Sequence, residues 1–173
     1  MQKEIRKDNT QLIQLCSVHN NQEIRGFFGE YRWLSNFHMC DVYYKGALYP
    51  SSEHAYMSAK TKSITEKKPF LKIPSANGHC GLSAAQARKY GQNVTLRKDW
   101  EEIKTSVMLE CLLSKFTNNE DLKNKLLETE NRYLEETNWW GDKFFGVDYK
   151  TGEGQNILGR CLMKVRRFLQ DEL

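Results

Sequence analysis

The sequence predicts a compact, helix-dominated α+β domain with a few short antiparallel strands. Two patterns lead to this prediction. Segments with a helical apolar period and capped starts fill the middle and the end of the chain, and short aromatic runs broken by glycine flank the middle segments. A length of 173 residues with 39% hydrophobic side chains suits one domain with a buried core.

The chain begins with a polar stretch. We expect residues 1–24 to form a peripheral arm and residues 25–173 to form the folded domain. The aromatic segment 27–37 contains one glycine and predicts a strand that runs into a loop. Segment 41–49 carries a Lys-Gly pair between two apolar runs, which predicts a β-hairpin.

Two helices are predicted in the centre of the chain. A Pro-Ser-Ser triplet at 50–52 opens the first, which runs to Lys60, because a serine can cap the first free amides. The second begins at Ser83, with Gln86 as its capping-box partner, and ends at Gly91. Irregular connections between them are marked by Pro69, Pro74 and Gly78.

Three more helices complete the prediction. One begins at Asp99, with Glu102 in the capping-box position, and the next begins at Asn119. The aromatic segment 139–147 then predicts a strand kinked by glycines, and the glycine-rich loop 152–156 leads into a last helix with one apolar face.

Composition excludes several classes. No apolar stretch is long enough to span a bilayer, and the first residues lack the apolar core of a signal peptide, so we expect a cytoplasmic protein. Five scattered cysteines without a Cys-x-x-Cys pair predict reduced thiols and no metal or other cofactor. The net charge of +4 suits an anionic ligand, whereas the basic stretches 60–72 and 88–98 are more typical of solvated faces than of nucleic-acid binding.

The first predicted helix carries the clearest chemical pattern. Glu53, Tyr56 and Lys60 are spaced i, i+3 and i+7, so they project from one face. A carboxylate, a phenol and an amine aligned in this way can move protons and attack an electrophilic carbon. The alternative is that Glu53 and Lys60 are solvated and that Tyr56 packs in the core, which is commoner for an arbitrary helix. His54 points off this face and is expected to make structural hydrogen bonds.

Aromatic residues beside polar ones form a second pattern, at 31–37 and 139–142. Such segments can stack a flat base and hydrogen-bond its edge. The candidates are Trp33, Asn36, Asp142 and one of Trp139 and Trp140, whereas core packing explains Leu34, Phe37, Phe144 and Phe145. The loop 152–156 before a helix could cradle a phosphate, although a plain turn explains it equally well.

Several of these segments together resemble the NADAR family, in the family's order and over about residues 27–168. The resemblance rests on GEYRWLSNF (29–37), YPSSEHAYMSAK (49–60), ARKYG (87–91), LRKDW (96–100) with Lys104 and Met108, KF (115–116), WGD (140–142), FFGV (144–147) and GQNILGRCLM (154–163). It implies a compact α+β fold and N-glycosidase chemistry without a metal. The family's Glu-His-x-Tyr-x-x-x-Lys pattern falls on Glu53, His54, Tyr56 and Lys60.

Two activities follow from the resemblance. The leading one removes ADP-ribose from ADP-ribosylated guanine, either free or in RNA or DNA; the alternative releases ribose 5-phosphate from riboflavin-pathway intermediates. A binding module for NAD-derived ligands is a third alternative, but an aligned acid and amine are not needed for binding alone. Phe145 and Ile157 stand where Trp and His are common in the family, which leaves the choice of substrate open.

The resemblance also implies residue roles. Lys60 would attack the anomeric carbon and form a ring-opened Schiff base that water hydrolyses, while Glu53 would move protons at the sugar oxygen and the leaving nitrogen. Substrate would be held by the remaining candidates, Arg32, Trp33, Asn36, His54, Tyr56, Trp100, Trp140, Asp142, Gly154 and Asn156.

Overall fold

The computed structural model describes residues 2–72 and 81–172, with the side chains of residues 2–8 left undescribed. The prediction of irregular connections at Pro74 and Gly78 and that of a reduced thiol at Cys80 lie outside these ranges. The helices are α1 (Gln2–Cys16), α2 (Ser52–Ala59), α3 (Ile64–Lys67), α4 (Ala84–Gly91), α5 (Trp100–Thr117), α6 (Glu120–Glu128) and α7 (Ile157–Asp171), with 3₁₀ helices η1 (Gly29–Leu34) and η2 (Lys68–Phe70).

The strands are short and form three small sheets. They are β1 (Val18–His19), β2 (Glu23–Arg25), β3 (Val42–Tyr44), β4 (Ala47–Tyr49), β5 (Tyr133–Glu135), β6 (Thr137–Asn138) and β7 (Val147–Asp148). β1 and β2 are antiparallel, as are β3 and β4, which form the predicted hairpin. The prediction that the strands are antiparallel is wrong for two pairs, because β5 joins β2 and β7 joins β6 in parallel.

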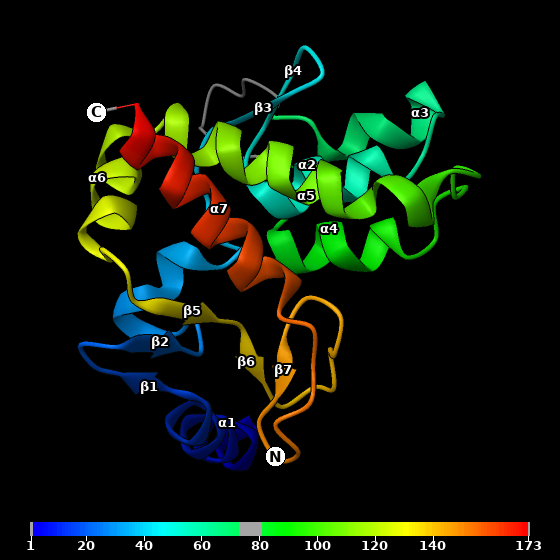
Figure 1. The fold of residues 1–173 in the computed structure, drawn as a ribbon. Coiled ribbons are helices and arrows are strands. Elements are labelled where there is room, and N and C mark those ends of the chain that lie inside the picture. The colour runs from blue at the N-terminus through cyan, green and yellow to red at the C-terminus, as the bar shows by residue number, and fades with distance from the viewer. Residues whose placement is uncertain (1, 73–80, 173) are drawn as a thin grey trace.

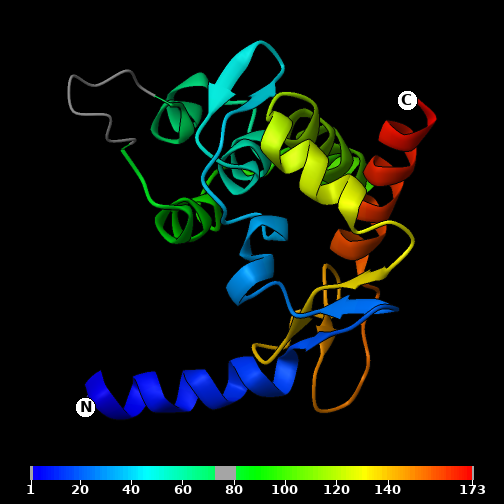
Figure 2. The same cartoon turned by 90° about the vertical axis from the view of Figure 1, so that its left-hand side faces the viewer.

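Most of the helices lie apart from two of the three sheets, while the β3–β4 hairpin lies with the helices and α1 lies beside β1 (Figure 1). Helices α2, α4, α5 and α6 gather in the upper part of the view, and α7 runs down from them toward the strands. Figure 2 shows α1 along the bottom of the view, on the side of β1 and β2, with its N-terminal end extending away from these strands. The α+β prediction is confirmed.

Strand β2 crosses the boundary predicted at residue 24. Ile24 pairs with Leu134 of β5, and both side chains are fully buried, because the short sheet lays one face against the core. Cys16 at the end of α1 is buried as well. The polar composition of residues 1–24 therefore does not describe the place of their last residues in the fold.

The predicted strand over 27–37 is wrong, because η1 occupies its centre. The Lys115 side chain is fully buried and its Nζ donates to the carbonyl oxygens of Trp33 at 2.7 Å and Ser35 at 2.9 Å. These bonds from α5 hold the two carbonyls inward, a geometry that an extended strand does not give. In segment 139–147 only Val147 belongs to a strand, so that prediction is also wrong over most of its length.

Helix α2 lies at the centre of the packing. All eight of its residues are buried, and it contacts α4, α5 and the hairpin strands. Helices α5 and α7 pack on each other through fully buried side chains such as Leu112 and Leu162. Burial of the whole of α2 excludes the alternative in which Glu53 is solvated.

The starts of the five predicted helices are confirmed, whereas α1 and α3 were not predicted, and only some of the predicted caps form. Ser51 accepts from the His54 amide, and Ser83 forms its capping box with Gln86. Asp99 makes no cap bond, because its carboxylate pairs with the Arg97 guanidinium. Asn119 makes none either; its amide reaches back to Lys115 and across to the hairpin.

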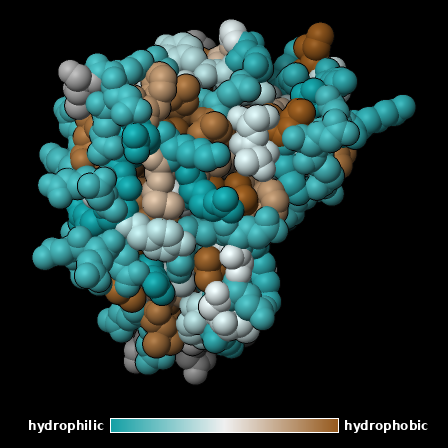
Figure 3. Space-filling view, viewed as in Figure 1, coloured by the Kyte–Doolittle hydropathy of each residue, from teal (hydrophilic) through white to brown (hydrophobic). Residues whose placement is uncertain are grey.

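The surface, the helices and the cysteines of the described ranges bear on the class of protein predicted from composition. On the face seen in Figure 3 the surface is mostly hydrophilic, with small apolar areas between polar side chains. None of the helices in the described ranges is long and apolar enough to cross a membrane. Cys16, Cys40, Cys111 and Cys161 are free thiols, and the described His, Cys, Asp and Glu side chains form no cluster that could hold a metal ion.

Candidate functional site

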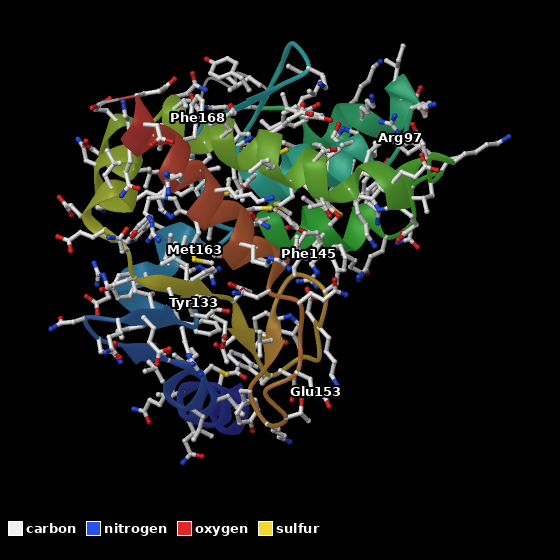
Figure 4. All side chains as sticks on the ribbon, in the orientation of Figure 1. Arg97, Tyr133, Phe145, Glu153, Met163 and Phe168 are labelled. Atoms are coloured by element: carbon white, nitrogen blue, oxygen red, sulfur yellow. The ribbon has the colours of Figure 1, made fainter. Side chains whose placement is uncertain are left out.

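A cavity of about 390 Å³ lies where the helical part meets the loops beyond the strands. Its size is that of a small-molecule site. Figure 4 labels one lining residue, Phe145, near the start of α7. The lining comprises Phe27, Phe28, Arg32, Ser35, Asn36, Phe37, Glu53, Tyr56, Met57, Arg88, Met108, Glu136, Trp139, Trp140, Asp142, Phe145 and Leu158.

Glu53 enters the cavity from the first turn of α2. Its backbone amide donates to the carbonyl of Asn36 at 3.1 Å, and its side chain is buried. Burial raises the pKa of Glu53 to about 7, with Arg88 and Lys60 opposing the shift. A carboxyl with a pKa near neutrality can accept or release a proton at physiological pH.

Tyr56 stands one turn further along α2 and also lines the cavity. Its ring lies 5.0 Å from that of Trp100 and 5.3 Å from that of Phe145, in tilted and edge-on geometry. Burial, reinforced by Glu53, raises the pKa of Tyr56 well above its ordinary value. The phenol therefore keeps its proton at neutral pH and is able to donate a hydrogen bond to a ligand.

Lys60 follows the last turn of α2 and is not among the described lining residues. Its Nζ donates to the carbonyl of Gly91 at the end of α4, at 2.7 Å. Burial lowers the pKa of Lys60, while Glu53 raises it. The predicted helical face thus places Glu53 and Tyr56 in the cavity, with the amine held to one side.

Arg32 and Asn36 reach the cavity from η1 and the segment after it. The Asn36 side chain accepts from Ser52 Oγ at 3.1 Å and donates to Met108 Sδ at 3.4 Å. The Arg32 guanidinium lies 5.9 Å from the centre of the Phe37 ring. Phe37 and Phe145, both expected in the core, are lining residues instead.

An aromatic group closes one side of the cavity. Phe28 stacks on Trp139 with ring centres 5.2 Å apart, and Trp140 meets Trp139 edge-on at 5.0 Å. Trp140 is 43% exposed, so part of its ring faces solvent. Both tryptophans line the cavity, where only one was expected, and flat faces of this kind can stack a base.

Asp142 lines the cavity and also shapes it. One of its carboxylate oxygens accepts from the amides of Phe144 at 3.1 Å and Phe145 at 2.9 Å. The Asn138 side chain donates to the Asp142 carbonyl and accepts from its amide. Because these bonds turn the chain back on itself, Phe145 lies against Tyr56 rather than in a strand.

Sequence reasoning missed Arg88 and Glu136 as lining residues. Arg88 belongs to the ARKYG segment and opens the basic stretch 88–98, which was expected to be a solvated face. Glu136 directly follows β5 and is adjacent to Glu135. Because the backbone there is irregular, the alternation of a strand does not apply, and nothing in the sequence tells which of the two side chains faces the cavity. Burial and Asp142 raise the pKa of Glu136 to about 8, against the effect of Arg32 and Arg88.

Five predicted binding residues do not appear among the described lining residues, and three of them are aromatic or imidazole side chains. Trp33 packs edge-on against Phe116 at 6.2 Å, and Trp100 packs on Tyr56 behind the cavity. His54 holds Ser51 Oγ at 2.7 Å through one ring nitrogen and the Leu82 carbonyl at 3.0 Å through the other.

The other two, Gly154 and Asn156, lie in the loop before α7. Asn156 is buried and left-handed, and its side chain donates to the Leu134 carbonyl and the Tyr133 hydroxyl. Its side-chain oxygen accepts from the Glu136 amide at 3.1 Å. A Cβ on Gly154 would lie 2.2 Å from the Gly146 carbonyl oxygen. The loop therefore braces the cavity wall from behind.

Known proteins match this chain over nearly its whole length. The sequence pattern of the NADAR domain matches residues 22–170. An N-glycosidase of Nostoc punctiforme is 31% identical over 145 residues, covering 83% of this chain and 88% of that protein. The N-glycosidase YbiA of Escherichia coli is 29% identical over 147 residues, covering 83% of this chain and 84% of YbiA.

Two further similarities concern a longer relative and a solved structure. A riboflavin biosynthesis protein of Vibrio vulnificus is 36% identical over 143 residues; the match covers 80% of this chain but only 36% of that protein. The NMR structure of E. coli YbiA superimposes with a TM-score of 0.73 at 28% identity, over 93% of this chain and 92% of YbiA. The fold around the cavity is thus similar to that of a solved N-glycosidase.

Proposed function

The chain belongs to the NADAR family, and on this premise we propose that it is an N-glycosidase that hydrolyses the bond between a ribose and a base nitrogen. The observation that carries the proposal is Glu53, a buried carboxyl whose pKa lies near 7, on the wall of an aromatic-lined cavity. Relatives of nearly the same length bear the name N-glycosidase, which supports the bond type.

Glu53 acts as the proton carrier on the sugar side. Cleavage of a ribose–nitrogen bond requires a proton at the departing nitrogen and removal of one from the attacking group. A carboxyl that titrates near neutrality does either with little free-energy cost. The Tyr56 phenol beside it stays protonated and can hold a sugar oxygen by a hydrogen bond.

Lys60 is the proposed nucleophile, forming a Schiff base with C1 of the opened ribose, which water then hydrolyses. The amine must leave the Gly91 carbonyl to reach the cavity, a movement that the four-carbon stem of lysine permits. Burial lowers its pKa, which favours the neutral amine that attack requires. Gly91 would then hold the amine between turnovers.

Base and phosphate find separate partners in the cavity. Trp139 and Trp140 offer ring faces for the base, with Asn36 beside them for its polar edge. Arg32 and Arg88 are the cationic lining residues, and a guanidinium pairs well with a phosphate. A substrate with a phosphorylated ribose linked to a base matches this distribution.

The proposed substrate is ADP-ribosylated guanine, either free or within a nucleic acid. A cavity of about 390 Å³ encloses a nucleoside-sized group, so the rest of the substrate must extend past its mouth, where Trp140 is half exposed. A second candidate is ribose 5-phosphate release from riboflavin-pathway intermediates, which the name of the Vibrio relative favours.

A direct competition of substrates tests the proposal. Purified protein would be given ADP-ribosylated guanosine, a DNA oligonucleotide with one ADP-ribosylated guanine, and the riboflavin-pathway intermediates, with products measured by mass spectrometry. We expect kcat/KM for ADP-ribose release to exceed that for ribose 5-phosphate release by at least about tenfold, which corresponds to ~1.4 kcal/mol. The reverse ratio would establish the second candidate, and binding without cleavage would establish a binding module.

A further inference from the structure

We infer that Glu136 is a second catalytic carboxyl, the acid that protonates the departing base, while Glu53 serves the sugar and the nucleophile. This inference rests on the proposed N-glycosidase function and divides its proton transfers between two walls of the cavity. Glu53 stands on helix α2, and Glu136 stands on the segment between β5 and β6.

One carboxyl oxygen of Glu136 is buried without a hydrogen-bond partner. Its Oε2 is closed to solvent and has no hydrogen-bond partner within the described residues. By contrast, Asn36 Oδ1 accepts from Ser52, and one carboxylate oxygen of Asp142 accepts from two backbone amides. A buried carboxyl oxygen without a partner is costly, and such a group calls for a functional explanation.

The backbone around Glu136 is fixed from both sides. Its amide donates to Asn156 Oδ1 at 3.1 Å, and its carbonyl accepts from the Val147 amide at 2.9 Å. Gly146 packs so closely that a Cβ there would lie 2.3 Å from the Glu136 carbonyl oxygen and 3.2 Å from its Cγ. The carboxyl is therefore placed by the fold and does not depend on a mobile loop.

The charged groups around Glu136 come from several elements. Asp142, Glu53, Arg32 and Arg88 act on it from the cavity walls, and Lys115 and Cys16 lie near enough for Glu136 to influence their own titration. Burial and Asp142 outweigh the two arginines, so the pKa of Glu136 is raised to about 8. The carboxyl therefore carries a proton at neutral pH, as an acid must before it acts.

The proton transfers balance as follows. The bond between ribose C1 and the base nitrogen breaks, and its electron pair stays on the nitrogen, which takes the Glu136 proton. A bond forms from C1 to the attacking amine or water, which releases a proton to the Glu53 carboxylate. Arg32 and Arg88 stabilise the Glu136 carboxylate until it regains a proton from solvent and Glu53 loses its own.

The test compares Glu136→Gln, Glu136→Asp and Glu135→Gln with the wild type. Gln keeps the size of the side chain but has no acidic proton, and Asp keeps the proton on a shorter stem. Glu135 is the matched control because it is adjacent and buried, and its side chain accepts from Thr137 Oγ1 at 2.8 Å instead of lining the cavity. Folding of each variant would be checked by circular dichroism and thermal unfolding.

We expect Glu136→Gln to lower the rate constant of single-turnover cleavage, and kcat with it, by about 100-fold or more. The Kd for substrate should change less than threefold. Glu136→Asp should recover at least tenfold over Glu136→Gln, and Glu135→Gln should stay within threefold of wild type. Wild-type kcat should also fall as pH rises through about 8, and this fall should be absent from the residual activity of Glu136→Gln.

A Glu136→Gln variant with near-wild-type kcat, or one that keeps the fall near pH 8, would overturn the role of Glu136 and leave the N-glycosidase function standing. A wild-type protein that cleaves none of the substrates would instead overturn the proposed function itself. The two failures are therefore distinguishable in one series of assays.

Discussion

The two walls of the cavity are built from different kinds of backbone. Helix α2 presents Glu53 and Tyr56 at a helical spacing, and both side chains are set by one buried helix. The opposite wall consists of η1 and the loops around β6 and β7, where polar side chains from outside each turn hold it in place. Lys115, Asn138 and Asn156 supply those bonds.

This difference separates the chemistry at the sugar, on the helical wall, from recognition and protonation of the base, on the loop wall. The helical wall carries Glu53, which we propose for the sugar, and Lys60, the proposed nucleophile, directly follows the helix of that wall. The loop wall carries Arg32, the two tryptophans and the second carboxyl, Glu136, whose positions depend on bonds from residues outside the cavity. Changes on the helical wall should therefore affect the rate of cleavage, and changes behind the loop wall should affect stability and binding as well.

The largest expected effect lies at the end of the helical wall. Lys60→Ala should lower kcat by about 1000-fold or more, because the proposed nucleophile is lost, an effect of roughly 4 kcal/mol. Borohydride added during turnover should reduce a sugar adduct onto Lys60, detected by peptide mass spectrometry. Lys62→Ala, an exposed lysine two residues on, is the control and should behave as wild type. Undiminished cleavage by Lys60→Ala would point to direct attack by water.

The next largest effect is expected at Asn156, which braces the loop wall from behind. Asn156→Ala removes the partners of the Glu136 amide, the Leu134 carbonyl and the Tyr133 hydroxyl. We expect the free energy of unfolding to fall by about 3 kcal/mol in urea titrations, since buried groups are left unpaired. Asn93→Ala, which removes one exposed side-chain bond, should cost less than about 1 kcal/mol. Equal losses would mean that the loop is not a brace.

The raised carboxyl pKa values make stability depend on pH. The folded pKa values of Glu53 and Glu136, about 7 and about 8, lie above their ordinary value of 4.5. The contribution of these two carboxyls to the free energy of unfolding is therefore fully present below pH 4.5 and is lost as pH rises through 7 and 8. Between pH 5 and pH 9, the free energy of unfolding of Glu136→Gln should fall by about 2 kcal/mol less than that of wild type. Each unit of raised pKa corresponds to about 1.4 kcal/mol, and entry of water into the cavity reduces this full effect. Parallel stability curves for the two proteins would contradict the raised pKa.

The smallest effect is expected at the mouth of the cavity. Trp140→Ala should raise KM about fivefold with little change in kcat, because a partly exposed ring contributes only about 1 kcal/mol of stacking. Phe168→Ala is the control, since Phe168 is 44% exposed and lies on α7 in the upper part of the molecule (Figure 4). A larger change in kcat than in KM would place Trp140 in the chemistry.

The same contrast sets how much could be predicted from the sequence. The α2 face, the hairpin and the Ser51 and Ser83 caps follow from local spacing, and the structure has them. The 3₁₀ helix η1 could not be predicted, because a lysine about 80 residues away fixes its carbonyls. Glu136 was missed for a similar reason: contacts with Asn156 and Gly146, not a repeating pattern, fix its place.

The division between the walls is tested most directly by Glu53→Gln, with substrate binding and cleavage measured on the same folded protein. We expect substrate Kd to stay within about threefold of wild type, because the loop wall is intact, while single-turnover cleavage falls by about 1000-fold. Cleavage near the wild-type rate would contradict the role of Glu53, and with it the assignment of the sugar chemistry to the helical wall.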